Sequence, residues 1–178
     1  MLQTFFLWFY CLPIAYVVLL MTGFGVLYHL LRKYLPKTHL RKPGGMVLLF
    51  FSILVIVCAT LTDRTPGAIT EPRLKPFYSL LMAAAGEKEF LRESFMNIVL
   101  FYPTGLLACG LLPERWNRAG KVFLVVLLSA CLSAGIEFSQ FQFALGRAEV
   151  DDVIHNTLGA FIGAMVSCFD FDCSHSKG

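Results

Sequence analysis

Charged residues are scarce in this sequence of 178 residues, of which only 15% are Asp, Glu, Lys or Arg and 57% are hydrophobic. So little charge is atypical of a soluble domain of this size, and apolar runs of 17 residues or more recur along the chain. Runs of this length are typical of helices that cross a lipid bilayer. The net charge is only +3, and Lys and Arg form no basic stripe, so we expect no nucleic-acid partner.

The sequence also lacks the cysteine patterns of disulfide frameworks and metal sites. There is no CxxC and no Cys/His spacing typical of zinc. Only Cys173 lies in a polar segment, whereas five cysteines lie in apolar runs, where cysteine usually acts as a small hydrophobic residue: Cys11, Cys58, Cys109, Cys131 and Cys168. We therefore expect no metal and no cofactor.

The apolar runs predict an all-α, polytopic membrane helix bundle that forms a single membrane domain over residues 1–178. About five transmembrane helices are expected, at residues 5–31, 46–62, 94–112, 122–145 and 153–169. The first run is too long for a signal-peptide core and no cleavage site follows it, so we interpret it as a helix that stays in the membrane. Pro43-Gly44-Gly45 is expected to break the chain before the second helix.

The connection at residues 63–93 holds five basic and five acidic residues and is predicted to lie outside the hydrocarbon core. Its apolar stretch at 77–85 is too short to cross a bilayer, so an interfacial or re-entrant segment is expected.

The distribution of charge predicts an orientation for the five helices. Nine Lys and Arg residues fall on the side of the loops after helices one and three and of the C-terminus, against six on the other side. Short loops rich in basic residues usually face the cytoplasm. We therefore expect a multi-pass inner-membrane protein with its N-terminus outside and its C-terminus in the cytoplasm.

Glu137 is an ionisable residue inside the fourth predicted helix, about 12 Å from the end of that helix at Leu145. A charge at the centre of a membrane helix costs about 2.5–3.5 kcal/mol on insertion scales, so such residues usually face protein or water. Gln140 lies three residues later on the same face. Two interpretations stay open: a polar clasp to another helix, or a role in ligand binding or proton handling.

Other polar residues belong to the same half of the membrane, because the third helix starts where the fourth ends and the fifth starts. The candidate ligand-binding residues of this polar funnel are Asn97, Glu137, Gln140, Arg147, Asp151, Asp152 and Asn156. Asp152 could instead cap the fifth helix. We expect Arg147 to reach Glu137 and to form one network with it and Asp152, because a buried acid stays charged only beside a cation or hydrogen-bond donors.

Small residues predict where helices pack closely. Asn156 shares a face with Gly159 and Gly163, and a GxxxG pattern lets two helix backbones approach each other. In the third helix, Pro103 removes one backbone donor and is expected to produce a kink, and Gly105 follows it.

The runs FMNIVLFYPTG, EFSQ and GRAEVDDVIHNTLGAFIG together resemble the VanZ-like family of small integral membrane proteins. The resemblance covers residues 94–169, and Glu149 stands where many relatives have aspartate. It implies a bacterial inner-membrane protein, and the founding member of the family is linked to resistance to teicoplanin-type glycopeptide antibiotics.

Two classes of function remain open. In the first, the outward-facing funnel binds an envelope lipid or a lipid-linked cell-wall precursor, with Arg147 on phosphate or carboxylate. In the second, the protein is an intramembrane enzyme with Glu137 as acid or base, although Ser139 and Thr157 lack the partners of a nucleophile. A small proton-coupled transporter is a further possibility. The sequence leaves the oligomeric state open.

Overall fold

The computed structural model describes residues 14–34, 41–61, 67 and 71–175, without the side chains at a few helix ends. These residues form six helices and no strand, which confirms the all-α fold class. The helices are α2 (Ile14–Tyr34), α3 (Arg41–Leu61), α4 (Tyr78–Ala84), α5 (Lys88–Leu111), α6 (Arg118–Gln142) and α7 (Val150–His175).

Four of these helices are long and apolar enough to cross a membrane: Lys42–Leu61, Lys88–Leu111, Arg118–Gln142 and Val150–Phe169. The beginning of the first predicted span, 5–31, lies outside the described residues. Helix α2 covers its second part and packs against α3 and α5. The structure thus agrees with a polytopic helix bundle. The predicted number of about five membrane helices is approximate.

The helix boundaries differ from the sequence prediction: α6 ends at Gln142 rather than Leu145, and α7 begins at Val150 rather than Val153. Pro43-Gly44-Gly45 does not break the chain, because α3 begins at Arg41 and includes all three residues. Proline is tolerated in the first turn, where its missing amide hydrogen would have no partner in any case. Helix α5 begins at Lys88 rather than Ser94 and continues through Pro103 to Leu111.

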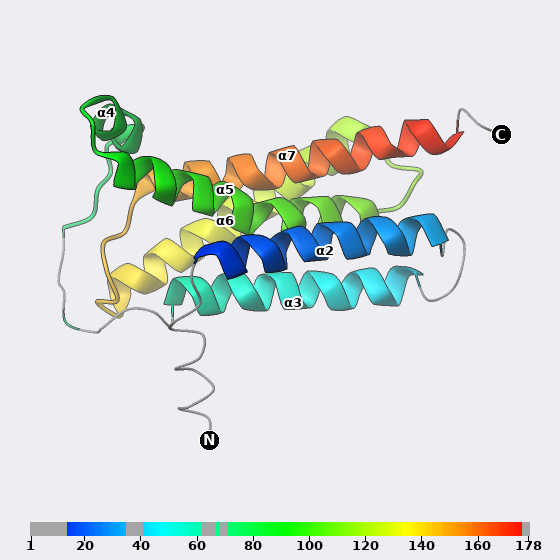
Figure 1. Cartoon of the computed structure of the whole chain (residues 1–178), viewed down its shortest axis with the longest axis horizontal. Coiled ribbons are helices and arrows are strands. Elements are labelled where there is room, and N and C mark those ends of the chain that lie inside the picture. The colour runs from blue at the N-terminus through cyan, green and yellow to red at the C-terminus, as the bar shows by residue number, and fades with distance from the viewer. Residues whose placement is uncertain (1–13, 35–40, 62–66, 68–70, 176–178) are drawn as a thin grey trace, which may run out of the picture.

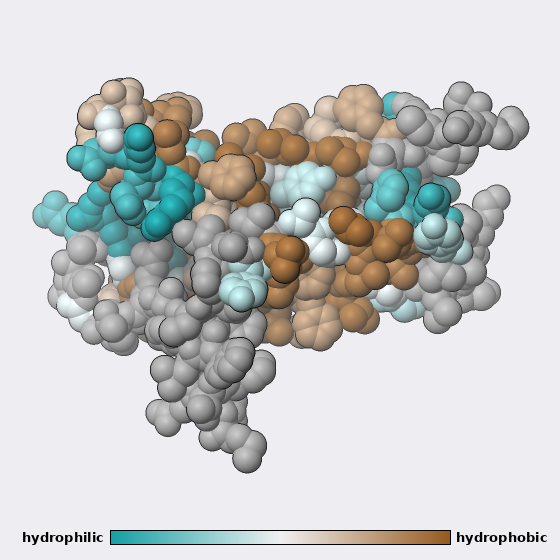
Figure 2. Space-filling model, in the orientation of Figure 1, coloured by the Kyte–Doolittle hydropathy of each residue, from teal (hydrophilic) through white to brown (hydrophobic). Residues whose placement is uncertain are grey.

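The long helices run side by side and alternate in direction (Figure 1). The start of α5, the end of α6 and the start of α7 lie at the same end of the bundle, and the short helix α4 lies beyond them. The helix ends on which the predicted site residues lie are therefore at the same end of the bundle. On the face shown in Figure 2, hydrophilic residues gather at both ends and an apolar band separates them.

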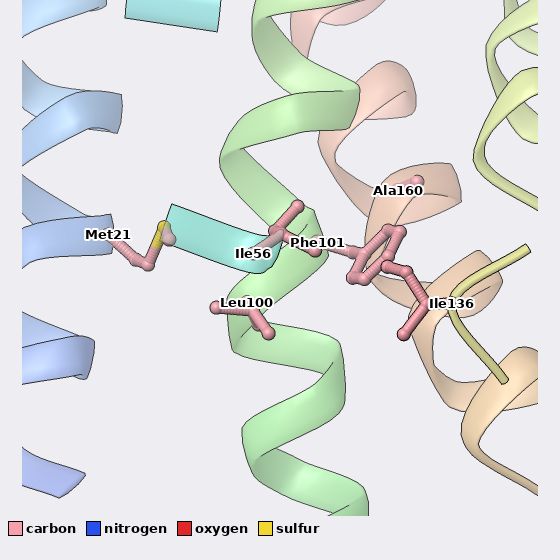
Figure 3. Close-up of a cluster of buried hydrophobic side chains, with 6 residues drawn as sticks. All are labelled: Met21, Ile56, Leu100, Phe101, Ile136 and Ala160. Atoms are coloured by element: carbon pink, nitrogen blue, oxygen red, sulfur yellow. The ribbon is translucent and has the colours of Figure 1, made fainter. Parts of the chain in front are cut away.

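Helix α5 lies at the centre of the bundle and makes its most extensive contacts with α7. Phe101 of α5 is completely buried and points toward residues of α6 and α7 (Figure 3). Side chains from five helices form this core cluster: Met21, Ile56, Leu100, Phe101, Ile136 and Ala160. Large apolar side chains also point outward, as expected of a surface that faces lipid; Phe123 and Phe138 are 69% and 66% exposed.

Glycines bring the backbones of α5 and α7 into direct contact. A Cβ atom added at Gly159 would lie 2.2 Å from the carbonyl oxygen of Ile98, and one at Gly163 would lie 2.1 Å from that of Tyr102. From the other side, a Cβ atom at Gly105 would lie 2.0 Å from the carbonyl oxygen of Ala160. The predicted close packing of the glycine face is therefore confirmed, and its partner is α5.

Candidate functional site

Glu137 is only 7% exposed in α6, and its carboxylate points to the turn that leads into α7. The backbone amide of Glu149 donates a hydrogen bond to its Oε2 atom over 2.8 Å. Glu149 directly precedes α7, and amides at the start of a helix have no partner within it. This contact is a clasp between α6 and the start of α7, which is the structural alternative that the sequence left open.

Asp151, in the first turn of α7, is 3% exposed and holds the start of the short helix α4. Its carboxylate accepts hydrogen bonds from the Phe77 amide at 2.6 Å, the Ser79 amide at 2.7 Å and the Ser79 hydroxyl at 2.5 Å. Phe77 has the left-handed backbone conformation, with φ of 59°, which is uncommon for a large side chain. Asp151 thus ties the long connection onto the membrane bundle.

A second attachment of the connection involves Arg73. Its backbone pairs with the turn before α7, donating to Ala148 at 2.8 Å and accepting from Val150 at 3.1 Å. Its guanidinium bonds the carboxylate of Glu149 at 2.9 Å and lies 4.3 Å from the ring centre of Tyr78. Sequence reasoning missed Arg73, Glu149 and Ser79 as members of this polar end. The only signal for Arg73 was the balanced charge of the 63–93 connection.

Asp152 bonds to α5 rather than capping its own helix. Helix α7 begins at Val150, so Asp152 lies within the first turn, past the position of an N-cap. Its Oδ1 atom accepts a hydrogen bond from the side-chain amide of Asn97 over 2.8 Å. This contact places two predicted site residues against each other and links α7 to α5.

Gln140 and Asn156 also connect helices. The amide of Gln140 donates to the carbonyl oxygen of Thr60 in α3 over 2.9 Å. The amide of Asn156 donates to the hydroxyl of Ser133 in α6 over 2.9 Å. Both side chains are almost completely buried, at 1% and 2% exposed. Hydrogen bonds between side chains and neighbouring helices contribute about 0.6 kcal/mol each in membrane proteins.

Several buried polar atoms at this end have no hydrogen-bond partner among the described residues: Gln140 Oε1, Arg147 Nε, Asn156 Oδ1 and Thr157 Oγ1. Leaving a buried polar group unpaired costs about 1–3 kcal/mol, and more when the group is charged. Such a set within one end of a bundle is typical of a place where a ligand or water binds.

The expected network of Arg147 with Glu137 and Asp152 is not seen among the described residues and stays a prediction. Within the described residues, Arg147 makes no hydrogen bond or ion pair with either acid. The Glu149 amide bonds Glu137 and the Asn97 amide bonds Asp152, so the acids reach protein donors without Arg147.

Two apolar grooves lie on the sides of the bundle, and no predicted site residue lines either of them. One, of about 490 Å³, runs between α2 and α5 and includes Thr22, His29 and Tyr102. The other, of about 550 Å³, runs between α6 and α7 and includes Phe161 and Cys168. In a bilayer, grooves of this composition contact acyl chains rather than headgroups.

Comparison with known proteins agrees with the sequence motifs. Residues 46–169 match the sequence model of the VanZ/LLP1 family, a range that begins before the 94–169 segment of the motifs. The chain is 39% identical over 74 residues to Protein VanZ of Enterococcus faecium. That alignment covers 40% of this chain and 42% of the relative, so it spans less than half of either protein. No solved structure matches.

The family match covers more than half of the chain. It includes most of α3, the connection with its Arg73 and Ser79 contacts, and all the predicted site residues. These features, together with several apolar membrane-length helices, indicate a multi-pass membrane protein. The chain belongs to the VanZ/LLP1 family.

Proposed function

We propose that this protein binds the anionic headgroup of a membrane lipid at its polar end, with Arg147 as the contact for a headgroup oxygen. The observation that carries the proposal is the buried Nε atom of Arg147, which has no acceptor among the described residues. A guanidinium carries five donors in a planar fork that matches phosphate and carboxylate oxygens. An anion would satisfy the donor and neutralise the charge at the same time.

The neighbouring acids support this assignment because they are already engaged. Glu137, Asp151 and Asp152 each accept hydrogen bonds from other residues, so their carboxylates serve to hold the turn, α4 and α5. The positive charge of Arg147 is therefore available to a ligand. The same observation favours binding over acid–base catalysis, because the Glu137 carboxylate has a structural partner.

Unpartnered acceptors would complement the guanidinium. Gln140 Oε1 and Asn156 Oδ1 are buried at the same end of the bundle, and each can accept a hydrogen bond from a headgroup hydroxyl or amine. The proposed ligand chemistry is thus an anionic oxygen group next to hydrogen-bond donors. Both bulk phospholipids and polyprenyl diphosphate precursors of the cell wall carry phosphate on a membrane anchor.

The test measures lipid binding to the purified full-length protein in detergent by native mass spectrometry. The probes are phosphatidylglycerol, phosphatidylcholine as the neutral reference, and a polyprenyl diphosphate. We expect the wild type to bind at least one of the two anionic probes saturably. Arg147→Gln should lose most of this binding, and Arg147→Lys should recover part of it. The anionic probe that binds more tightly shows whether the headgroup belongs to a bulk phospholipid or to a polyprenyl diphosphate.

The matched control is Arg92→Gln, because Arg92 belongs to the same end, is 57% exposed and pairs with Glu89 on its own helix. We expect this variant to bind like the wild type. Equal binding by all variants, or equal binding of phosphatidylcholine, would reject an anion site at Arg147.

A further inference from the structure

Two cysteine thiols meet at the end of the bundle opposite the polar end. Cys109 lies near the end of α5 and Cys168 lies in the second half of α7. Their Sγ atoms are 3.4 Å apart, and the residues are 0% and 6% exposed. The sequence suggested only two separate small hydrophobic residues, whereas the tertiary structure brings them into direct sulfur contact.

The packing of α5 on α7 brings together the backbones that carry the two thiols. A disulfide requires sulfurs about 2.05 Å apart and close backbones, with Cα atoms within about 4.4–6.8 Å. The glycine contacts at Gly105 and Gly163 hold these same two backbones together about one turn before each cysteine. The sulfurs need to approach by about 1.4 Å, which side-chain rotation can supply.

The surroundings of the thiols select the kind of reagent that can reach them. Cys109 and Cys168 share an apolar cluster with Val125 and Ala164, which separates them from water-soluble reductants and oxidants. Cys168 nevertheless lines the groove of about 550 Å³ between α6 and α7, beside Met165 and Phe161. This groove opens on the apolar side of the bundle, so a reagent that enters it comes from the lipid phase.

We propose that Cys109 and Cys168 form a redox-active dithiol that a lipid-soluble quinone oxidises to an intramolecular disulfide. One bond forms between the two Sγ atoms, and the two S–H bonds break. The two electrons and two protons pass to the quinone, which becomes the quinol. The product joins α5 covalently to α7, and the reverse reaction needs a thiol reductant.

The test uses the full chain in liposomes under anaerobic conditions with a metal chelator and a short-chain benzoquinone that partitions into lipid and whose ring is fully substituted, so that thiols cannot add to it. Peptide mapping without reduction then identifies any disulfide, and absorbance follows quinol formation. We expect a single linkage between Cys109 and Cys168, one quinol per disulfide, and reversal by dithiothreitol once the protein is unfolded in dodecyl sulfate. Cys131, which is exposed on α6, is expected to remain alkylatable and serves as the internal control.

Two variants sharpen the test. Cys168→Ser is expected to lose both the disulfide and quinol formation. Met165→Trp fills the groove and is expected to slow oxidation by the quinone. Complete alkylation of Cys109 and Cys168 after quinone treatment of the wild type would overturn the proposal. A disulfide that involves Cys58 or Cys131 instead would also overturn the proposal. Both of these results would be obtained with the wild-type protein.

Discussion

The carboxylate of Glu137 accepts a hydrogen bond from the backbone amide of Glu149 over 2.8 Å. The side chain of Glu149 in turn bonds Arg73, which belongs to the connection before α4. A single acid in α6 therefore holds the α6–α7 turn, and that turn holds the connection before α4. The costly burial of Glu137 is offset by a structural contact at the proposed binding end.

Replacing Glu137 separates its role in the turn from any role in proton transfer. Glu137→Gln keeps an oxygen that accepts from the Glu149 amide, so we expect thermal stability and lipid binding near those of the wild type. Glu137→Ala removes the acceptor and should lower the free energy of unfolding by about 1.5–3 kcal/mol. Thermal unfolding in detergent checks both. A stable Glu137→Gln protein that has lost all function would assign the acid a chemical role instead.

The glycine contacts between α5 and α7 predict a sharp position dependence for alanine substitutions. Gly159→Ala and Gly163→Ala place a Cβ atom within 2.2 and 2.1 Å of backbone oxygens of α5, so the helices must separate. We expect a loss of about 1–3 kcal/mol and a lower folded yield. Gly135→Ala is the control, because a Cβ atom there would meet nothing within 4 Å. Equal melting temperatures for the three variants would contradict the close packing.

Removing the side chain of Asp151 should release the connection. Asp151→Ala leaves two backbone amides at the start of α4 and the Ser79 hydroxyl without their acceptor. We expect faster proteolysis within residues 71–87, measured by limited digestion and mass spectrometry, because docked segments resist cleavage. Ser79→Ala should give a smaller effect. Cleavage at the wild-type rate in Asp151→Ala would show that other contacts hold α4.

If headgroup binding underlies a resistance function, Arg147→Gln should lower the teicoplanin concentration that a host strain tolerates. The measurement compares susceptibility in cells that express wild-type, Arg147→Gln or Arg92→Gln protein at matched membrane levels. Only the Arg147 variant is expected to lose protection. Protection that survives in Arg147→Gln would separate any resistance activity from the Arg147 site.

The orientation in the membrane remains a prediction from charge. Single cysteines introduced at Ser176 and at Arg115, in a cysteine-free background, should be labelled by an impermeant maleimide only after the cells are opened. A cysteine at Gly86 should be labelled in intact cells, because the connection is expected to face outward. The reverse labelling pattern would invert the orientation, and the polar end would then face the cytoplasm.

The sequence by itself determined the class of the fold, because the thickness of a bilayer sets the length of the apolar run that can cross it, and run length is a local property of the sequence. It also placed Asn97, Glu137, Asp152 and Asn156 at one end, since helices that alternate in direction must bring those segments together. The glycine face of α7 was readable for the same reason, because residues four apart share a helix face. These conclusions depend on the length and spacing of residues within helices and on the alternating direction of consecutive helices.

Only the tertiary structure decided which polar groups meet. Glu137 bonds a backbone amide rather than Arg147, and a main-chain donor carries no signature in the amino-acid sequence. Arg73 and Ser79 lie more than 70 residues before their partners Glu149 and Asp151, so no local pattern could pair them. The contact between Cys109 and Cys168 depends equally on how α5 and α7 are rotated about their axes. That rotation is set by packing across the whole bundle, which single-helix periodicity does not determine.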